Sequence, residues 1–102
     1  MDTTLKEEEV RRVAPLFDGG RLLSTPAAVG AFSPQQMAAA LSRHFSGDWS
    51  DCDPYDAQAN RDALTSGGRL FGVYRVEGAA SPMWIITEAD RSVTTILLPE
   101  DY

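Results

Sequence analysis

The pattern of apolar and polar positions predicts a helical first part and a strand-rich second part. Met37, Leu41 and Phe45 recur every four residues and form one apolar stripe, which indicates a helix over about 34–46. Ser33 precedes this stripe as an N-cap, with proline at the first helical position and glutamine at the third. Cap and stripe together predict the same helix.

A second main helix is expected over about 54–66. Asp53 supplies its N-cap and a proline again follows. Tyr55, Ala59 and Ala63 share one face, with Leu64 beside it. Two consecutive glycines end the helix.

The chain changes character after these glycines and becomes rich in β-branched and aromatic residues. The segments 69–76, 83–88 and 92–98 predict a three-stranded antiparallel meander. An apolar run at 21–24 is compatible with a further short strand, and a brief capped helix is expected over 26–31. The predicted fold class is α+β, with helices followed by a sheet that packs its apolar face on them.

The length of 102 residues fits one small domain with a modest core. Residues 1–20 are expected to form an N-terminal arm or short helix, and residues 21–102 a single α+β domain. The acidic, polar start does not resemble a signal peptide, and no run approaches the ~18 apolar residues of a membrane helix. Cys52 is the one cysteine, which excludes an internal disulfide and fits a cytoplasmic location.

The net charge of −6 is unevenly spread along the chain. The segment 48–62 contains Arg61 and five acids, which are Asp48, Asp51, Asp53, Asp56 and Asp62. This balance argues against direct binding to nucleic acid, whose phosphates require a basic surface. It favours either solubility alone or a protein partner with a basic surface.

A second polar cluster follows the middle strand of the predicted meander. Glu88, Asp90, Arg91 and Ser92 bring acid, base and hydroxyl groups close together, as a hydrolase site requires. The single histidine, His44, lies on another element. The preferred interpretation is therefore a hairpin tip, in which Arg91 pairs with one of the two acids.

The sequence favours neither a calcium-binding loop nor a thiol–imidazole pair. A calcium loop that starts at Asp51 fails because Asp56 replaces the required glycine and Asp62 replaces the final glutamate. A thiol–imidazole pair of His44 and Cys52 is not required by their spacing. The sequence thus predicts no catalytic residue, no metal and no cofactor.

Both tryptophans are candidates for packing. Trp84 lies in a predicted strand and is expected in the core. Trp49 lies in a polar loop, where it either fastens the loop to the domain or stands out as a binding anchor.

Three stretches carry a resemblance to known proteins: GDWSD, RLFGVYRV and the C-terminal WIITEADRSVTTILLPEDY. Over about Gly20 to Tyr102, the chain resembles a family of small "plasmid-related" proteins from bacterial plasmids, phages and other mobile elements. The resemblance supplies no catalytic residue. It implies a context in which small acidic proteins often counter host defence by binding a nuclease or its complex.

Three functional hypotheses follow. The first is a non-enzymatic protein-binding module, such as an anti-CRISPR or antirestriction inhibitor, that presents the carboxylates of 48–62, with Trp49 as anchor, to a defence nuclease or CRISPR complex. The turn residues Glu88, Asp90 and Arg91 are further partner-binding candidates. The second hypothesis is a small hydrolase or ribonuclease-like toxin built on these turn residues. The third is an antitoxin or a self-assembling accessory protein, including a homodimer, that pairs through an exposed strand edge.

Overall fold

The computed structural model describes residues 15–102. The arm expected over 1–20 lies mostly outside the described residues, and residues 15–20 form neither helix nor strand. The elements follow in the order β1 (Arg21–Ser24), α2 (Pro26–Ala31), α3 (Pro34–Phe45), α4 (Pro54–Ser66), β2 (Leu70–Tyr74), β3 (Met83–Thr87), β4 (Val93–Leu97) and the short 3₁₀ helix η1 (Pro99–Asp101).

The predicted helices are confirmed, together with the side chains that start them. Ser33 Oγ accepts the Gln36 N–H at 3.1 Å, and the Gln36 side chain accepts the Ser33 N–H at 2.8 Å, which completes the capping box of α3. Thr25 and Asp53 cap α2 and α4 in the same position. α4 ends at Gly67, whose φ of +82° lies in the left-handed region that glycine adopts without strain.

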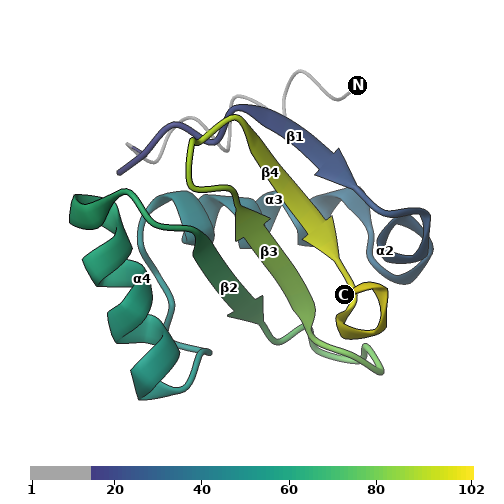
Figure 1. Cartoon of the computed structure of the whole chain (residues 1–102). Helices are drawn as coiled ribbons and strands as arrows, with labels where there is room; N and C mark the ends of the chain where they lie inside the picture. Colours follow the sequence, from purple (N-terminus) through teal and green to yellow (C-terminus); the bar gives the residue numbers. More distant parts are fainter. Residues whose placement is uncertain (1–14) are drawn as a thin grey trace.

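The sheet has four strands rather than the predicted three, and it is mixed rather than purely antiparallel. Its order is β1-β4-β3-β2, so the meander is present and β1 is added to it in parallel beside β4 (Figure 1). Backbone bonds from Arg21 N–H to Ser92 C=O and from Thr25 N–H to Ile96 C=O, each 3.0 Å, fix this register. A parallel pair needs a long crossover, which here comprises α2, α3, α4, β2 and β3, so local sequence pattern could not reveal it.

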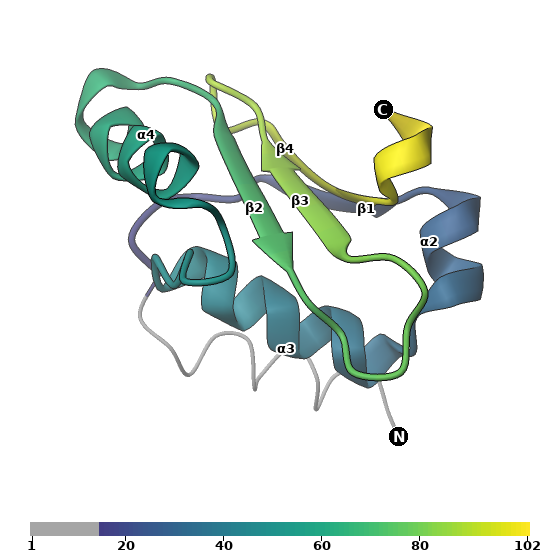
Figure 2. The same cartoon turned by 90° about the horizontal axis from the view of Figure 1, so that it is seen from below.

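One face of the sheet is covered by α3 (Figure 2). The predicted stripe is confirmed for Leu41 and Phe45, which are buried, whereas Met37 is half-buried. The buried apolar strand residues on this face are Leu70, Tyr74, Met83, Ile85 and Ile96. The core therefore lies between the sheet and α3.

Trp84 lies on the opposite face of the sheet and is half-buried, so the expectation that it belongs to the core is wrong. Strand alternation is the cause, because its neighbours Met83 and Ile85 point to α3. Its indole is flanked by Phe71 and Tyr102 in edge-to-face contacts, with ring centroids 4.9 and 5.8 Å away.

The outer edge of β2 is occupied by side chains from α4 and the loop before it. The Asn60 side chain donates to Phe71 C=O at 2.7 Å and accepts from Phe71 N–H at 2.9 Å, as a neighbouring strand would. Asp51 Oδ2 accepts the Arg75 N–H at 2.9 Å, and the Cys52 thiol lies 3.8 Å from Phe71 C=O. These contacts close this edge to a further strand.

Candidate functional site

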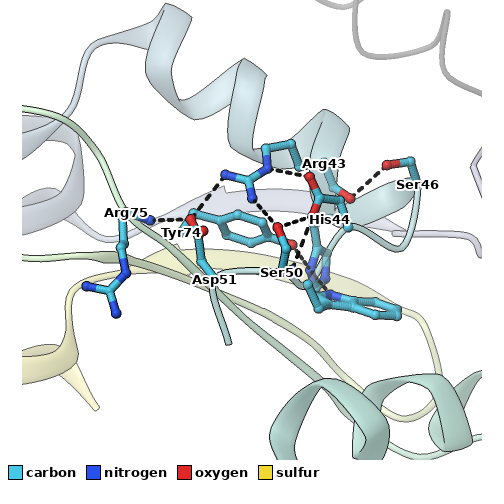
Figure 3. Close-up of polar contacts among 9 residues, drawn as sticks. Arg43, His44, Ser46, Ser50, Asp51, Tyr74 and Arg75 are labelled. Atoms are coloured by element: carbon cyan, nitrogen blue, oxygen red, sulfur yellow. Dashed lines mark hydrogen bonds and ion pairs between the residues drawn. The ribbon is translucent and has the colours of Figure 1, made fainter. Parts of the chain in front are cut away.

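The loop between α3 and α4 is held by one guanidinium group (Figure 3). Arg43 Nε bonds Asp48 Oδ2 at 2.7 Å, Nη1 bonds Asp51 Oδ2 at 3.2 Å and Nη2 donates to Ser50 Oγ at 3.1 Å. The same guanidinium lies 5.0 Å from the centre of the Tyr74 ring. Two of the five aspartates in the acidic segment 48–62 are thus engaged within the protein.

The electrostatics of Asp48 and Asp51 follow from these contacts. Hydrogen bonds from Arg43 and then Ser50 hold the pKa of Asp48 well below its usual range. The backbone N–H of Arg75 is the main cause of the lowered pKa of Asp51, with Arg43 adding to it. The two carboxylates also raise the pKa of Arg43. Both acids are therefore fixed in their charged form near neutral pH.

Trp49 packs inside the domain and offers no surface anchor, because its side chain is only 2% exposed. Its indole Nε1 donates a hydrogen bond to His44 Nδ1 at 3.1 Å. Of the two interpretations of Trp49, the structure shows the one in which it fastens the loop to the domain.

His44 is fully buried in the core between α3 and the sheet. Its Nδ1 lies 3.2 Å from Tyr74 Oη, and its Nε2 lies 3.0 Å from Thr87 Oγ1. Burial lowers the pKa of His44 to about 3, so the imidazole is neutral at physiological pH. The Cys52 thiol contacts the Phe71 carbonyl instead, and burial is the main cause of its raised pKa. The weighed thiol–imidazole pair is therefore not formed.

The exposed part of the acidic segment lies on α4. Asp53 is occupied as the cap, whereas Asp62 is exposed and accepts a hydrogen bond from the Gln58 side chain at 2.9 Å. Burial, and then the neighbouring charge of Asp53, raises the pKa of Asp56. Tyr55 stands between these acids with 83% of its surface exposed.

Of the residues predicted to share one face, Tyr55, Ala59 and Ala63, only Ala63 is buried. α4 instead buries Ala57, Asn60 and Ala63, the face that meets β2. The polar Asn60 lies at an inward position because its side chain satisfies the backbone groups at the β2 edge. We call the set Asp53, Tyr55, Asp56 and Asp62, in which Asp56 is half-buried and the others are exposed, the acidic face.

The calcium hypothesis finds no support in the described part of the chain. No group of three or more His, Cys, Asp or Glu side chains within residues 15–102 is placed to hold a metal ion. Asp51 is directed to Arg43 and to the Arg75 backbone, and Asp53 to the start of α4.

The turn from Glu88 to Ser92 is a hairpin tip, as preferred from sequence, but Arg91 does not pair with its acids. Its Nη1 donates to Gly68 C=O at 2.6 Å and its Nη2 to Ala63 C=O at 3.0 Å, across to the end of α4. The φ of +63° at Arg91 accompanies this arrangement.

The remaining groups of the turn bond locally. Asp90 Oδ1 accepts the Ser92 N–H at 3.0 Å and its hydroxyl at 2.6 Å, which lowers the pKa of Asp90. Glu88 is exposed, and its carbonyl accepts the Arg91 N–H at 2.8 Å. The turn residues therefore hold the hairpin and the end of α4 together, and Arg91 is directed away from the carboxylates that a hydrolase site would use.

Comparison with protein-family models, curated proteins and solved structures finds no match for this chain. The resemblance to plasmid-related proteins therefore stays a prediction. Among the helices of residues 15–102, none has the length and apolar character needed to cross a membrane.

Proposed function

We propose that this protein is a small protein-binding module of a mobile genetic element, and that its acidic face binds a basic surface on a host-defence nuclease or CRISPR complex. The observation that carries the proposal is the exposure of Tyr55 among carboxylates on α4. Tyrosine is enriched among the residues that dominate binding energy, because its ring supplies a large contact area with little conformational freedom to lose.

The position of Tyr55 and Asp62 supports this role. They are seven residues apart on one helix, so both lie on the same exposed side. The helix itself is anchored by Asn60 to β2 and by Arg91 at its last turn. A surface held this firmly loses little freedom on binding, which favours affinity.

Asp48 and Asp51, which bond Arg43, are assigned a structural role rather than a contact with the partner. Asp48 and Asp51 shape the loop through Arg43, so their removal would disturb structure as well as charge. We assign the contact with a partner to the acidic face, with the exposed Tyr55 rather than the buried Trp49 as its anchor.

The experiment is an affinity pull-down from a bacterial lysate at low and moderate salt, read by mass spectrometry. The test variant is Tyr55→Ala/Asp62→Asn. The control is Tyr102→Ala/Glu100→Gln, which removes the same kinds of exposed group at the C-terminus. The proposal expects a nuclease or CRISPR component that the wild type and the control capture and the test variant loses. Equal capture by all three would refute it.

A further inference from the structure

The two edges of the sheet are treated differently by the fold. Side chains of Asn60 and Asp51 occupy the backbone groups at the β2 edge. At the other edge, β1 presents Leu22 and Leu23 with 50% and 42% of their surfaces exposed. Figure 1 shows β1 as the outermost strand, beside β4.

The backbone of β1 has a defined set of outward groups. The N–H groups of Arg21 and Thr25 point to β4, and strand alternation directs Leu23 the same way. Leu22 and Ser24 therefore turn their N–H and C=O groups to the outer edge, where no other strand of residues 15–102 pairs with them. Unpaired edge groups of this kind are a template for another strand.

We propose that a second copy of this chain occupies this edge, with the two β1 strands antiparallel about a two-fold axis through Leu23. In this register Leu22 lies opposite Ser24 of the other copy, and the outward groups of both residues form four backbone hydrogen bonds. Leu23 meets its own counterpart as a cross-strand pair, which removes its exposed surface from water. The two sheets become one eight-stranded sheet.

The charges of Arg21 and Asp101 are complementary across this edge, which favours a second copy of the chain as the added strand. The same register places Arg21 opposite Thr25 of the other copy, whose hydroxyl donates to Asp101 Oδ2 at 2.7 Å. Asp101 Oδ2 also accepts the Leu98 N–H at 3.0 Å, and neither bond uses Oδ1. η1, which carries Asp101, lies at the α2 end of β1 (Figure 1). Two symmetric ion pairs between Arg21 and Asp101 therefore flank the strand pair.

The dimer goes beyond the proposed function and leaves the acidic face free. Its contacts are on β1 and η1, whereas the acidic face is on α4 at the opposite edge of the sheet. A dimer would present two copies of the acidic face and so favour a partner with repeated basic sites.

The test is sedimentation equilibrium of the full chain at concentrations up to about 1 mM. Wild type is expected to show a monomer–dimer equilibrium. Leu22→Pro removes an outward N–H that β4 does not use, so it is expected to abolish the dimer while circular dichroism remains that of the folded protein. A monomeric wild type, or a dimer that survives in folded Leu22→Pro, would overturn the proposal.

A charge exchange tests the register even if Leu22→Pro fails to fold. In a homodimer of Arg21→Glu, both ion pairs become two acids, and in a homodimer of Asp101→Lys both become two bases. Each variant is therefore expected to dimerise about tenfold more weakly than the wild type. Mixed in equal amounts, they form a heterodimer in which both pairs are again opposite in sign. Recovery of dimer on mixing is the expected result. No recovery, with both variants folded, would contradict the assigned register.

Discussion

Trp49 donates its indole N–H to Nδ1 of His44, and this contact fixes the tautomer of the buried histidine. An indole can only donate, so Nδ1 accepts and the ring proton of the neutral imidazole resides on Nε2. Nε2 then donates to Thr87 Oγ1 at 3.0 Å, and Thr87 donates to Thr94 Oγ1 at 2.8 Å. Thr94 in turn donates to the Gly19 carbonyl at 2.8 Å, so the hydroxyls of Thr87 and Thr94 each have a defined donor direction in this series of hydrogen bonds.

The first prediction concerns the pH dependence of stability. The pKa of His44 is about 3 in the folded protein, against about 6.5 in the unfolded chain. Between these values the unfolded state binds the additional proton, so the free energy of unfolding falls as pH drops below about 6.5. The expected slope is about 1.4 kcal/mol per pH unit, or about 2 kcal/mol between pH 6.5 and 5.

Urea denaturation at pH 7.5, 6.5, 5.5 and 5 measures this slope. Asp48 and Asp51, whose pKa values are lowered, contribute only below about pH 4 and do not interfere. His44→Gln is the control, because it removes the titrating group and should flatten the profile. An unchanged free energy of unfolding from pH 7.5 to 5 in the wild type would show that His44 is not held neutral.

The second prediction separates the buried hydroxyl chain from ordinary strand packing. Thr87→Val keeps the shape but leaves His44 Nε2–H without its acceptor, so a loss of about 1–3 kcal/mol is expected. Thr95→Val makes the same change on the opposite face of the sheet, where the expected effect is within about 0.5 kcal/mol. Equal losses for the two variants, measured by chemical denaturation, would argue against the directed chain.

The third prediction concerns Arg91. Two of its guanidinium nitrogens reach two different carbonyls near the end of α4, a fork that lysine cannot reproduce. Arg91→Lys and Arg91→Ala should therefore destabilise the protein by similar amounts, about 1–3 kcal/mol. Arg61→Ala, at an exposed position of α4, is the control and should have little effect. Full retention of stability in Arg91→Lys would mean that charge alone matters there.

The fourth prediction concerns the sealed edge of β2. Asn60→Ala removes both bonds to the Phe71 backbone, which exposes the edge as well as costing about 1–3 kcal/mol. Light scattering should show that Asn60→Ala forms species larger than a dimer, which Gln58→Ala, on the exposed side of the same helix, does not form. A destabilised but strictly non-aggregating Asn60→Ala would leave edge protection without support.

The accuracy of the sequence-based predictions depended on the range of the interaction. Thr25, Ser33 and Asp53 act on residues three positions away, so the three helix starts could be predicted. The parallel pairing of β1 with β4 joins segments about seventy residues apart, and no local pattern encodes it.

The candidate site shows the same limit. The acidic segment was visible in the sequence, but which carboxylates remain exposed depends on Arg43 and on the orientation of α4. Tyr55 is exposed because the inward face of α4 is the one that carries the polar Asn60. The polar Asn60, at an inward position of α4, is the signal in the sequence that bears on the orientation of this helix.

The central claim is that the acidic face on α4 binds a basic partner. The most direct measurement is the salt dependence of partner capture by the wild type, Tyr55→Ala/Asp62→Asn and Tyr102→Ala/Glu100→Gln. The account predicts capture by the wild type and the C-terminal control that weakens as salt rises, and loss of capture by the acidic-face variant at every salt concentration. Undiminished capture by Tyr55→Ala/Asp62→Asn, insensitive to salt, would contradict it.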